Sequence, residues 1–140
     1  MKIEEILETC IYVDDLEAAE HFYRNFLGLE MVSKLQDRHV FFQCGNQMFL
    51  IFNPEATDDE TLDFPPHGAK GAGHVAFGVK ESELDPWKEL LIKKGVEIEH
   101  ELTWPTGGRS IYFRDPAGNS LELVTAKTWE ITEENDGVVE

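Results

Sequence analysis

The sequence predicts an α+β fold in which the order strand, helix, strand, strand, strand occurs twice. Residues 8–13 are rich in β-branched and aromatic types, and the apolar residues that follow over 16–27 recur at helical spacing. The same two patterns return over 74–79 and 84–91. Each helical stretch is followed by three short apolar segments typical of strands. These observations indicate two related halves.

The helix of the first half has recognisable boundaries. Asp14 or Asp15 can cap its start, because a carboxylate accepts hydrogen bonds from the free backbone N–H groups there. Gly28 is suited to its end, because glycine tolerates a positive φ. The apolar stripe between them consists of Leu16, Ala19, Tyr23, Phe26 and Leu27. The strands expected next lie around 32–35, 38–44 and 47–53.

The second half follows the same plan. Its helix begins near Ser82 and ends at Gly95. The apolar stripe of this helix consists of Leu84, Trp87, Leu90 and Leu91. The strands expected after it lie at 96–102, 109–114 and 120–126. Gly45-Asn46 and Gly118-Asn119 predict a tight turn before the last strand of each half.

These matches divide a single domain of 140 residues into two modules. Glu8 and His74 are 66 positions apart, as are Val13 and Val79. The predicted divisions are module one at about 5–53, a linker at 54–72, module two at about 73–126 and an acidic tail at 127–140. Each helix can cover one face of its sheet, so the other face needs the second module or a ligand.

The composition limits the classes of partner. The formal net charge of −16 repels nucleic acid and anionic membranes, so neither is expected to bind. No apolar run approaches the ~18 residues of a membrane span, and the opening MKIEEI is too acidic for a secretory signal. Cys10 and Cys44 do not make a disulfide framework. We therefore expect a cytoplasmic protein with reduced thiols.

Three polar side chains fall on strand faces opposite the aliphatic ones. Because side chains alternate along a strand, Glu122 points away from Leu121 and Leu123. By the same alternation, Glu8 and His74 point away from the aliphatic residues of their own strands. Two carboxylates and an imidazole suit a divalent cation. The alternative for each is an ordinary structural or water-facing side chain, and the residues alone leave both open.

A family resemblance is carried by three segments: YVDDLEAAEHFYRNFLGLE at 12–30, GHVAFGV at 73–79 and GGRSIYFRDPAGNSLELV at 107–124. The DPAGN turn is the most specific, because its Asp-Pro and Gly-Asn pairs place the last strand in register with the one before it. Together these segments resemble the vicinal oxygen chelate superfamily, which includes glyoxalases, bleomycin- and fosfomycin-resistance proteins and extradiol dioxygenases. The resemblance covers about residues 5–126.

The resemblance implies two βαβββ modules that form a cup-shaped, mostly antiparallel eight-stranded sheet with the helices outside. Its metal ligands lie at matched positions of the first and fourth strands, which here are Glu8, Leu50, His74 and Glu122. Leu50 cannot bind metal, so three ligands remain, with open positions for water or substrate. The implied cofactor is one divalent ion, with Mn, Ni, Co, Zn or Mg all possible. Glu122 is the implied catalytic residue, because a carboxylate that leaves the metal can act as a base.

The resemblance also implies a homodimer. In the family, each cup is often built from one module of each subunit, so Glu8 would meet the partner subunit's His74 and Glu122. The alternative is a monomer whose two modules close on each other.

Four further residues are candidates for contact with a small-molecule substrate. Arg109 can clamp an anionic group with two hydrogen bonds, or it can pair with a surface carboxylate. Tyr12, Phe52 and Trp104 can wall a pocket, or they can pack in the core.

Three functions are compatible with these expectations. The first is a glyoxalase-like metalloenzyme, of lyase, isomerase or transferase type, that chelates a small oxygen-bearing substrate and stabilises an oxyanion or enolate. One His and two Glu favour a redox-neutral ion over the iron of a dioxygenase. The second is a metal-free small-molecule or drug-binding protein of the bleomycin-resistance kind, with which the acidic charge is compatible. The third is a regulatory or structural module with a vestigial site.

Overall fold

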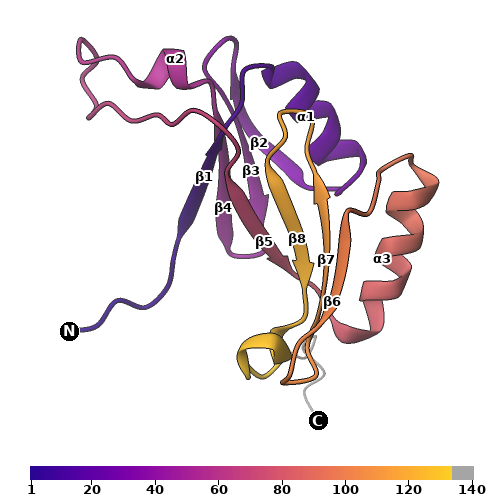
Figure 1. The fold of residues 1–140 in the computed structure, drawn as a ribbon. Coiled ribbons are helices and arrows are strands. Elements are labelled where there is room, and N and C mark those ends of the chain that lie inside the picture. Colours follow the sequence, from indigo (N-terminus) through magenta and orange to yellow (C-terminus); the bar gives the residue numbers. More distant parts are fainter. Residues whose placement is uncertain (134–140) are drawn as a thin grey trace. The chain divides into compact units, whose positions relative to one another are not determined.

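The first half of the chain forms a four-stranded sheet with one long helix (Figure 1). A computed structural model describes residues 1–133. The elements of this half are β1 (Glu8–Tyr12), α1 (Leu16–Asn25), β2 (Glu30–Leu35), β3 (His39–Cys44) and β4 (Gln47–Phe52). The strand order is β1-β4-β3-β2, with β1 parallel to β4 and the other neighbours antiparallel.

The second half repeats this arrangement. Its elements are β5 (His74–Gly78), α3 (Glu81–Lys93), β6 (His100–Thr103), β7 (Arg109–Arg114) and β8 (Ser120–Val124). The strand order is β5-β8-β7-β6, again with one parallel and two antiparallel pairings. A short helix, α2 (Pro54–Thr57), lies in the predicted linker, and a 3₁₀ helix (Ala126–Trp129) follows β8. Residues 134–140 of the predicted acidic tail lie outside the described residues.

The α+β class and the two βαβββ modules are confirmed, and the strands hydrogen-bond as two sheets of four. The registers show how closely the modules match. Cys10 of β1 pairs with Leu50 of β4, and Ala76 of β5 pairs with Glu122 of β8. Leu50 and Glu122 therefore occupy equivalent places. By contacts the chain divides into unit one, residues 1–73 with 115–119, and unit two, residues 74–114 with the described residues from 120 onward.

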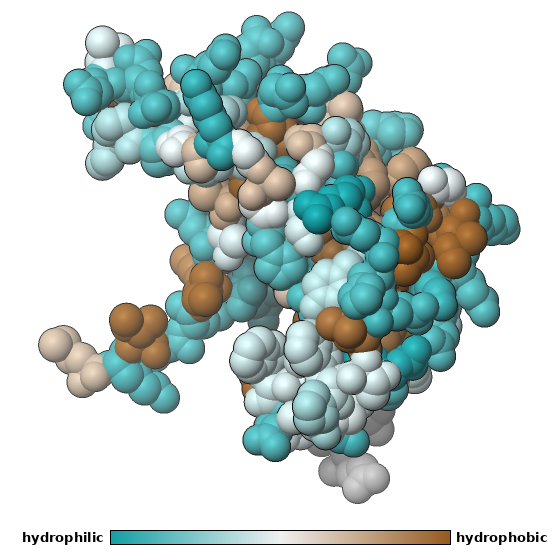
Figure 2. Space-filling view, viewed as in Figure 1, coloured by the Kyte–Doolittle hydropathy of each residue, from teal (hydrophilic) through white to brown (hydrophobic). Residues whose placement is uncertain are grey.

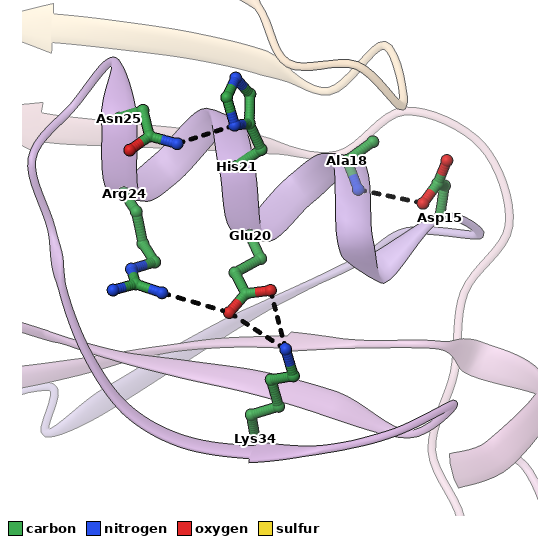
Figure 3. A network of polar contacts seen from close by, with 7 residues as sticks. All are labelled: Asp15, Ala18, Glu20, His21, Arg24, Asn25 and Lys34. Carbon is green, nitrogen blue, oxygen red and sulfur yellow. Dashed lines mark hydrogen bonds and ion pairs between the residues drawn. The ribbon is translucent and has the colours of Figure 1, made fainter.

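Helix α1 begins where the sequence provides a cap. The Asp15 carboxylate accepts a hydrogen bond from the Ala18 N–H at 3.0 Å, as Figure 3 shows. The buried residues of α1 are Ala19, Phe22 and Tyr23, and the helix contacts β3 and β4. On its polar side, Glu20 binds Lys34 of β2 at 3.1 Å and Arg24 at 3.4 Å (Figure 3). The helix thus buries its apolar stripe and keeps its charges at the surface.

The turn at 115–119 belongs to unit one and is held by several hydrogen bonds. The buried Asp115 carboxylate accepts from the backbone N–H groups of Ala117 at 3.0 Å and Asn119 at 2.8 Å. It also accepts from the Tyr23 hydroxyl at 2.7 Å. Burial, followed by the negative charge of Asp115, raises the pKa of Tyr23, so this hydroxyl stays a donor. Gly118 has φ 86°, a conformation that glycine adopts without strain.

Replacing Tyr23 by Phe is expected to lower the free energy of unfolding by about 1–3 kcal/mol, because the buried Asp115 loses a donor. Urea unfolding followed by circular dichroism measures the change. Tyr12→Phe is the matched control, because it removes a hydroxyl that is hydrogen-bonded to the exposed His67. Equal losses of stability in the two variants would contradict the special role of the Tyr23–Asp115 pair.

The surface is mostly hydrophilic, with hydrophobic residues exposed in a few places. Figure 2 shows them along the N-terminal segment and over α3. The largest exposed side chains in these two places are Met1, Ile3, Ile6, Leu7, Leu90 and Ile92. None of the helices described within residues 1–133 is long and apolar enough to cross a membrane.

Candidate metal-binding site

Glu122 is buried, although it lies on the face of β8 that is opposite the aliphatic side chains. Leu121 and Leu123 are 0% and 2% exposed, and Glu122 is 8% exposed. Burying an ionised carboxylate is costly unless charge or hydrogen bonds compensate it. The water-facing interpretation of Glu122 is therefore wrong, and neighbouring groups must compensate the charge of its buried carboxylate.

Both oxygens of Glu122 have a specific neighbour. Ser110 Oγ of β7 donates to Oε2 at 2.5 Å, and Nε2 of His74 lies 3.3 Å from Oε1. Tyr112 pairs with Glu122 across β7 and β8, so its side chain lies on the same face of the sheet. Burial and the nearby Glu122 carboxylate raise the pKa of Tyr112. The result is a polar site on the face of sheet two that α3 does not cover.

The imidazole of His74 is held in a defined orientation. Its Nδ1 lies 2.9 Å from the backbone carbonyl oxygen of Ser120. A carbonyl oxygen only accepts, so Nδ1 carries a proton and donates. In the neutral imidazole, Nε2 then presents its lone pair toward Oε1 of Glu122. Two electron-rich atoms in this position require a proton or a cation between them.

The spacing of these two atoms fits a divalent cation. Two ligands bound to one ion at about 2.0–2.2 Å, with an angle between about 90° and 110°, lie about 2.8–3.6 Å apart. The observed Nε2–Oε1 distance of 3.3 Å falls within this range. The Nδ1 hydrogen bond to a carbonyl is also the usual support of a metal-binding histidine. The described residues, 1–133, contain no group of three or more His, Cys, Asp or Glu side chains able to hold a metal ion.

Glu8, the third predicted ligand, begins β1 in unit one and is exposed. His74 and Glu122 both belong to unit two. Leu50, at the position equivalent to Glu122, is 9% exposed and packs as an apolar residue. The structure thus brings together two of the three predicted ligands.

Tyr12 and Phe52 belong to an aromatic cluster on unit one. The Tyr12 hydroxyl lies 2.6 Å from Nδ1 of His67, and the Tyr12 and Phe52 rings are 6.3 Å apart. Phe52 also contacts the His67 ring at 4.9 Å and the Arg38 guanidinium at 5.5 Å. Burial, a hydrogen bond with Cys10 and nearby negative charge raise the pKa of Tyr12 to about 12. Tyr12 is half-buried and Phe52 is buried.

Trp104 contacts the Glu122 site indirectly. Its indole Nε1 donates to Ser110 Oγ at 2.8 Å, and Ser110 is the residue that donates to Glu122. Trp104 lies in the loop that follows β6.

Arg109 is engaged elsewhere in unit two. Its guanidinium binds Asp85 of α3 at 2.7 Å and lies 3.8 Å from Glu81. Alternation along β7 places Arg109 on the face opposite Ser110, the face that α3 covers. This geometry matches the surface ion pair, which was the alternative to a substrate clamp.

Sequence reasoning missed Ser110, Tyr112 and His67. A signal for the first two existed, because alternation in RSIYFR sets Ser110 and Tyr112 opposite the aliphatic Ile111. The DPAGN turn then fixes the register that pairs Tyr112 with Glu122. His67 had no such signal, because it lies in an irregular part of the linker.

Comparison with known proteins agrees with this fold. The family model described as Glyoxalase/Bleomycin resistance protein/Dioxygenase superfamily matches residues 5–123. The chain belongs to this superfamily. The glyoxalase superfamily is the group that the sequence motifs resemble, so the resemblance is confirmed.

Several members of the glyoxalase superfamily are similar over most of their length. The crystal structure of a lactoylglutathione lyase from Agrobacterium tumefaciens has a TM-score of 0.90 and 45% identity, covering 94% of this chain and 100% of that one. The metallothiol transferase FosB of Shouchella clausii is 29% identical, over 81% of this chain and 74% of its own length. The glutathione transferase FosA of Serratia marcescens is also 29% identical, over 79% and 73%.

Proposed function

We propose that this protein is a divalent-metal-dependent enzyme that acts on a small substrate with two oxygen atoms able to bind the metal. The observation that carries the proposal is the His74–Glu122 pair, whose facing atoms are 3.3 Å apart with the imidazole oriented by Ser120. The relatives named as lyase and transferase support an enzymatic role. The metal is Mn, Ni, Co, Zn or Mg, because one His and two Glu suit a redox-neutral ion.

In this proposal His74 and Glu122 hold the ion, and Glu8 supplies the third ligand. A bound cation would act as a Lewis acid that stabilises negative charge developing on a substrate oxygen. Leu50 adds no ligand at the fourth matched position, so substrate oxygens have places to bind. Tyr12, Phe52 and Trp104 are proposed to contact the substrate. The reaction is of lyase, isomerase or transferase type.

We propose that the protein acts as a homodimer. In such a dimer Glu8 meets the partner subunit's His74 and Glu122. The exposed apolar residues at Ile6 and Leu7, directly before β1, support a protein contact near Glu8. We also propose a cytoplasmic location, with the Cys10 and Cys44 thiols reduced.

A second candidate function is a metal-free, drug-binding protein of the bleomycin-resistance kind. The net charge of −16 supports it, because an acidic protein attracts a cationic ligand. The aromatic rings of Tyr12 and Phe52 would suit the flat parts of such a ligand. This candidate gives His74 and Glu122 no role.

A metal-binding experiment separates the two candidates. Protein purified without chelator or nickel affinity resin is expected to contain a divalent metal by elemental analysis. After chelator treatment, adding Mn, Ni, Co or Zn is expected to raise the melting temperature, because an ion that binds only the folded state stabilises it. No bound metal and no thermal response, together with stabilisation by a cationic drug, would overturn the enzyme proposal in favour of the binding protein.

A further inference from the structure

The Ser110 hydroxyl lies between two groups that fix the direction of its hydrogen bonds. Ser110 is 1% exposed, and its Oγ is 2.8 Å from Trp104 Nε1 and 2.5 Å from Glu122 Oε2. An indole N–H can only donate, and an ionised carboxylate can only accept. Ser110 must therefore accept from Trp104 and donate to Glu122. The hydrogen bonds run from Trp104 through Ser110 to Glu122, and the Tyr112 hydroxyl is a further polar neighbour of both Ser110 and Glu122.

These hydrogen bonds determine which oxygen of Glu122 is available to bind a cation. Oε2 is occupied by the Ser110 hydroxyl, in a short charge-assisted hydrogen bond. Oε1 is left facing Nε2 of His74. The hydrogen bond from His74 to the Ser120 carbonyl fixes the other side of the pair. The other polar atom of each side chain is thus hydrogen-bonded, and Nε2 of His74 faces Oε1 of Glu122.

We infer that Ser110 is a positioning residue that makes Glu122 a fixed, one-oxygen metal ligand, with Trp104 setting the direction of its hydrogen bond. This inference rests on the proposed function. The sequence predicted that Glu122 leaves the metal and acts as a base. A carboxylate hydrogen-bonded at Oε2 is restrained from leaving, so the inference makes Glu122 a permanent ligand instead. Ser110 touches neither metal nor substrate and acts only through Glu122.

Metal affinity tests the inference without an activity assay. Titration calorimetry of chelator-treated protein with Co²⁺ or Ni²⁺ is expected to give a dissociation constant about 10–100-fold weaker in Ser110→Ala than in the parent. Ser110→Thr keeps a hydroxyl and is expected to bind nearly as the parent does. Trp104→Phe keeps the packing but loses the N–H donor, so its affinity is expected to fall between the two.

The visible absorption of the cobalt-substituted protein gives a second readout. In Ser110→Ala the freed Oε2 can also bind the ion, which raises the coordination number and weakens the d–d bands. Ser110→Thr is expected to keep the parent spectrum. An effect on folding alone would not produce this spectral difference.

Thr125→Val is the matched control. Thr125 is also 1% exposed, and its hydroxyl accepts from the Arg109 N–H at 3.0 Å without touching Glu122. We expect its cobalt affinity and spectrum to equal those of the parent. Equal binding by Ser110→Ala and the parent, or equal weakening in Ser110→Ala and Thr125→Val, would overturn the role of Ser110 and leave the proposed function standing. A parent protein that binds no metal would overturn both.

Discussion

Replacing Glu122 by Gln is expected to remove most of the stabilisation that metal gives the protein. Gln keeps the shape of the side chain and can still accept from Ser110, but it lacks the charge that holds a cation. With metal at a hundredfold excess over its dissociation constant, binding adds about 2.7 kcal/mol to the parent. For a chain of this size the melting temperature rises on the order of 10 °C. Thermal melts of both proteins, with metal and with chelator, measure the difference.

The chelator-treated proteins give the complementary result. Glu122 is 8% exposed, so its charge is costly to bury when no cation is present. Glu122→Gln removes that cost, and the metal-free variant is expected to be as stable as the parent or slightly more so. Glu101→Gln is the matched control, because Glu101 forms a surface ion pair with Lys88 at 2.6 Å and should keep the full metal response. A metal response that survives in Glu122→Gln would show that Glu122 is not a ligand.

The drug-binding candidate makes a different prediction for the same variant. It expects no metal response in either protein, and it expects a cationic ligand to stabilise both. These outcomes cannot be produced by loss of a metal ligand, so one set of melts distinguishes the two functions.

Much of the fold could be predicted from the sequence, because it follows from local rules. The helical stripe from Leu16 and the Asp15 cap placed α1, and the alternation around Val75 and Phe77 placed β5. The Gly118-Asn119 turn fixed the register of the last strand against β7, so Glu122 could be placed on the face opposite Leu121. These features depend on spacing along the chain, which the sequence shows directly.

The surroundings of Glu122 could not be predicted, because they depend on contacts between strands and loops. Whether Ser110 reaches Glu122 is decided by the conformations of the two side chains, and whether Trp104 reaches Ser110 is decided by a loop. The ion pair of Arg109 depends on how α3 lies against β7. Side-chain rotamers, helix placement and loop shape decided these contacts, and none of them follows a period in the sequence.

Co-expression of Glu8→Gln with Glu122→Gln is expected to restore metal binding that each variant lacks alone. If each site takes Glu8 from one subunit and Glu122 from the other, the mixed dimer has one site with both residues intact and one with both replaced. Two different affinity tags allow the mixed dimer to be purified. Titration calorimetry is expected to show about one ion bound per mixed dimer at nearly the parent affinity.

The same experiment distinguishes this shared site from a site built within one chain. If each site takes Glu8 and Glu122 from one chain, every site in the mixed dimer carries one replaced ligand, and no binding returns. A mixed dimer of two Glu8→Gln chains, purified with the same tags, controls for metal carried by the tags and is expected to bind weakly in either case. Sedimentation that finds a monomer at micromolar concentration would rule out the shared site. A monomer that binds the metal tightly would instead mean that Glu8, His74 and Glu122 of one chain form the three-ligand site.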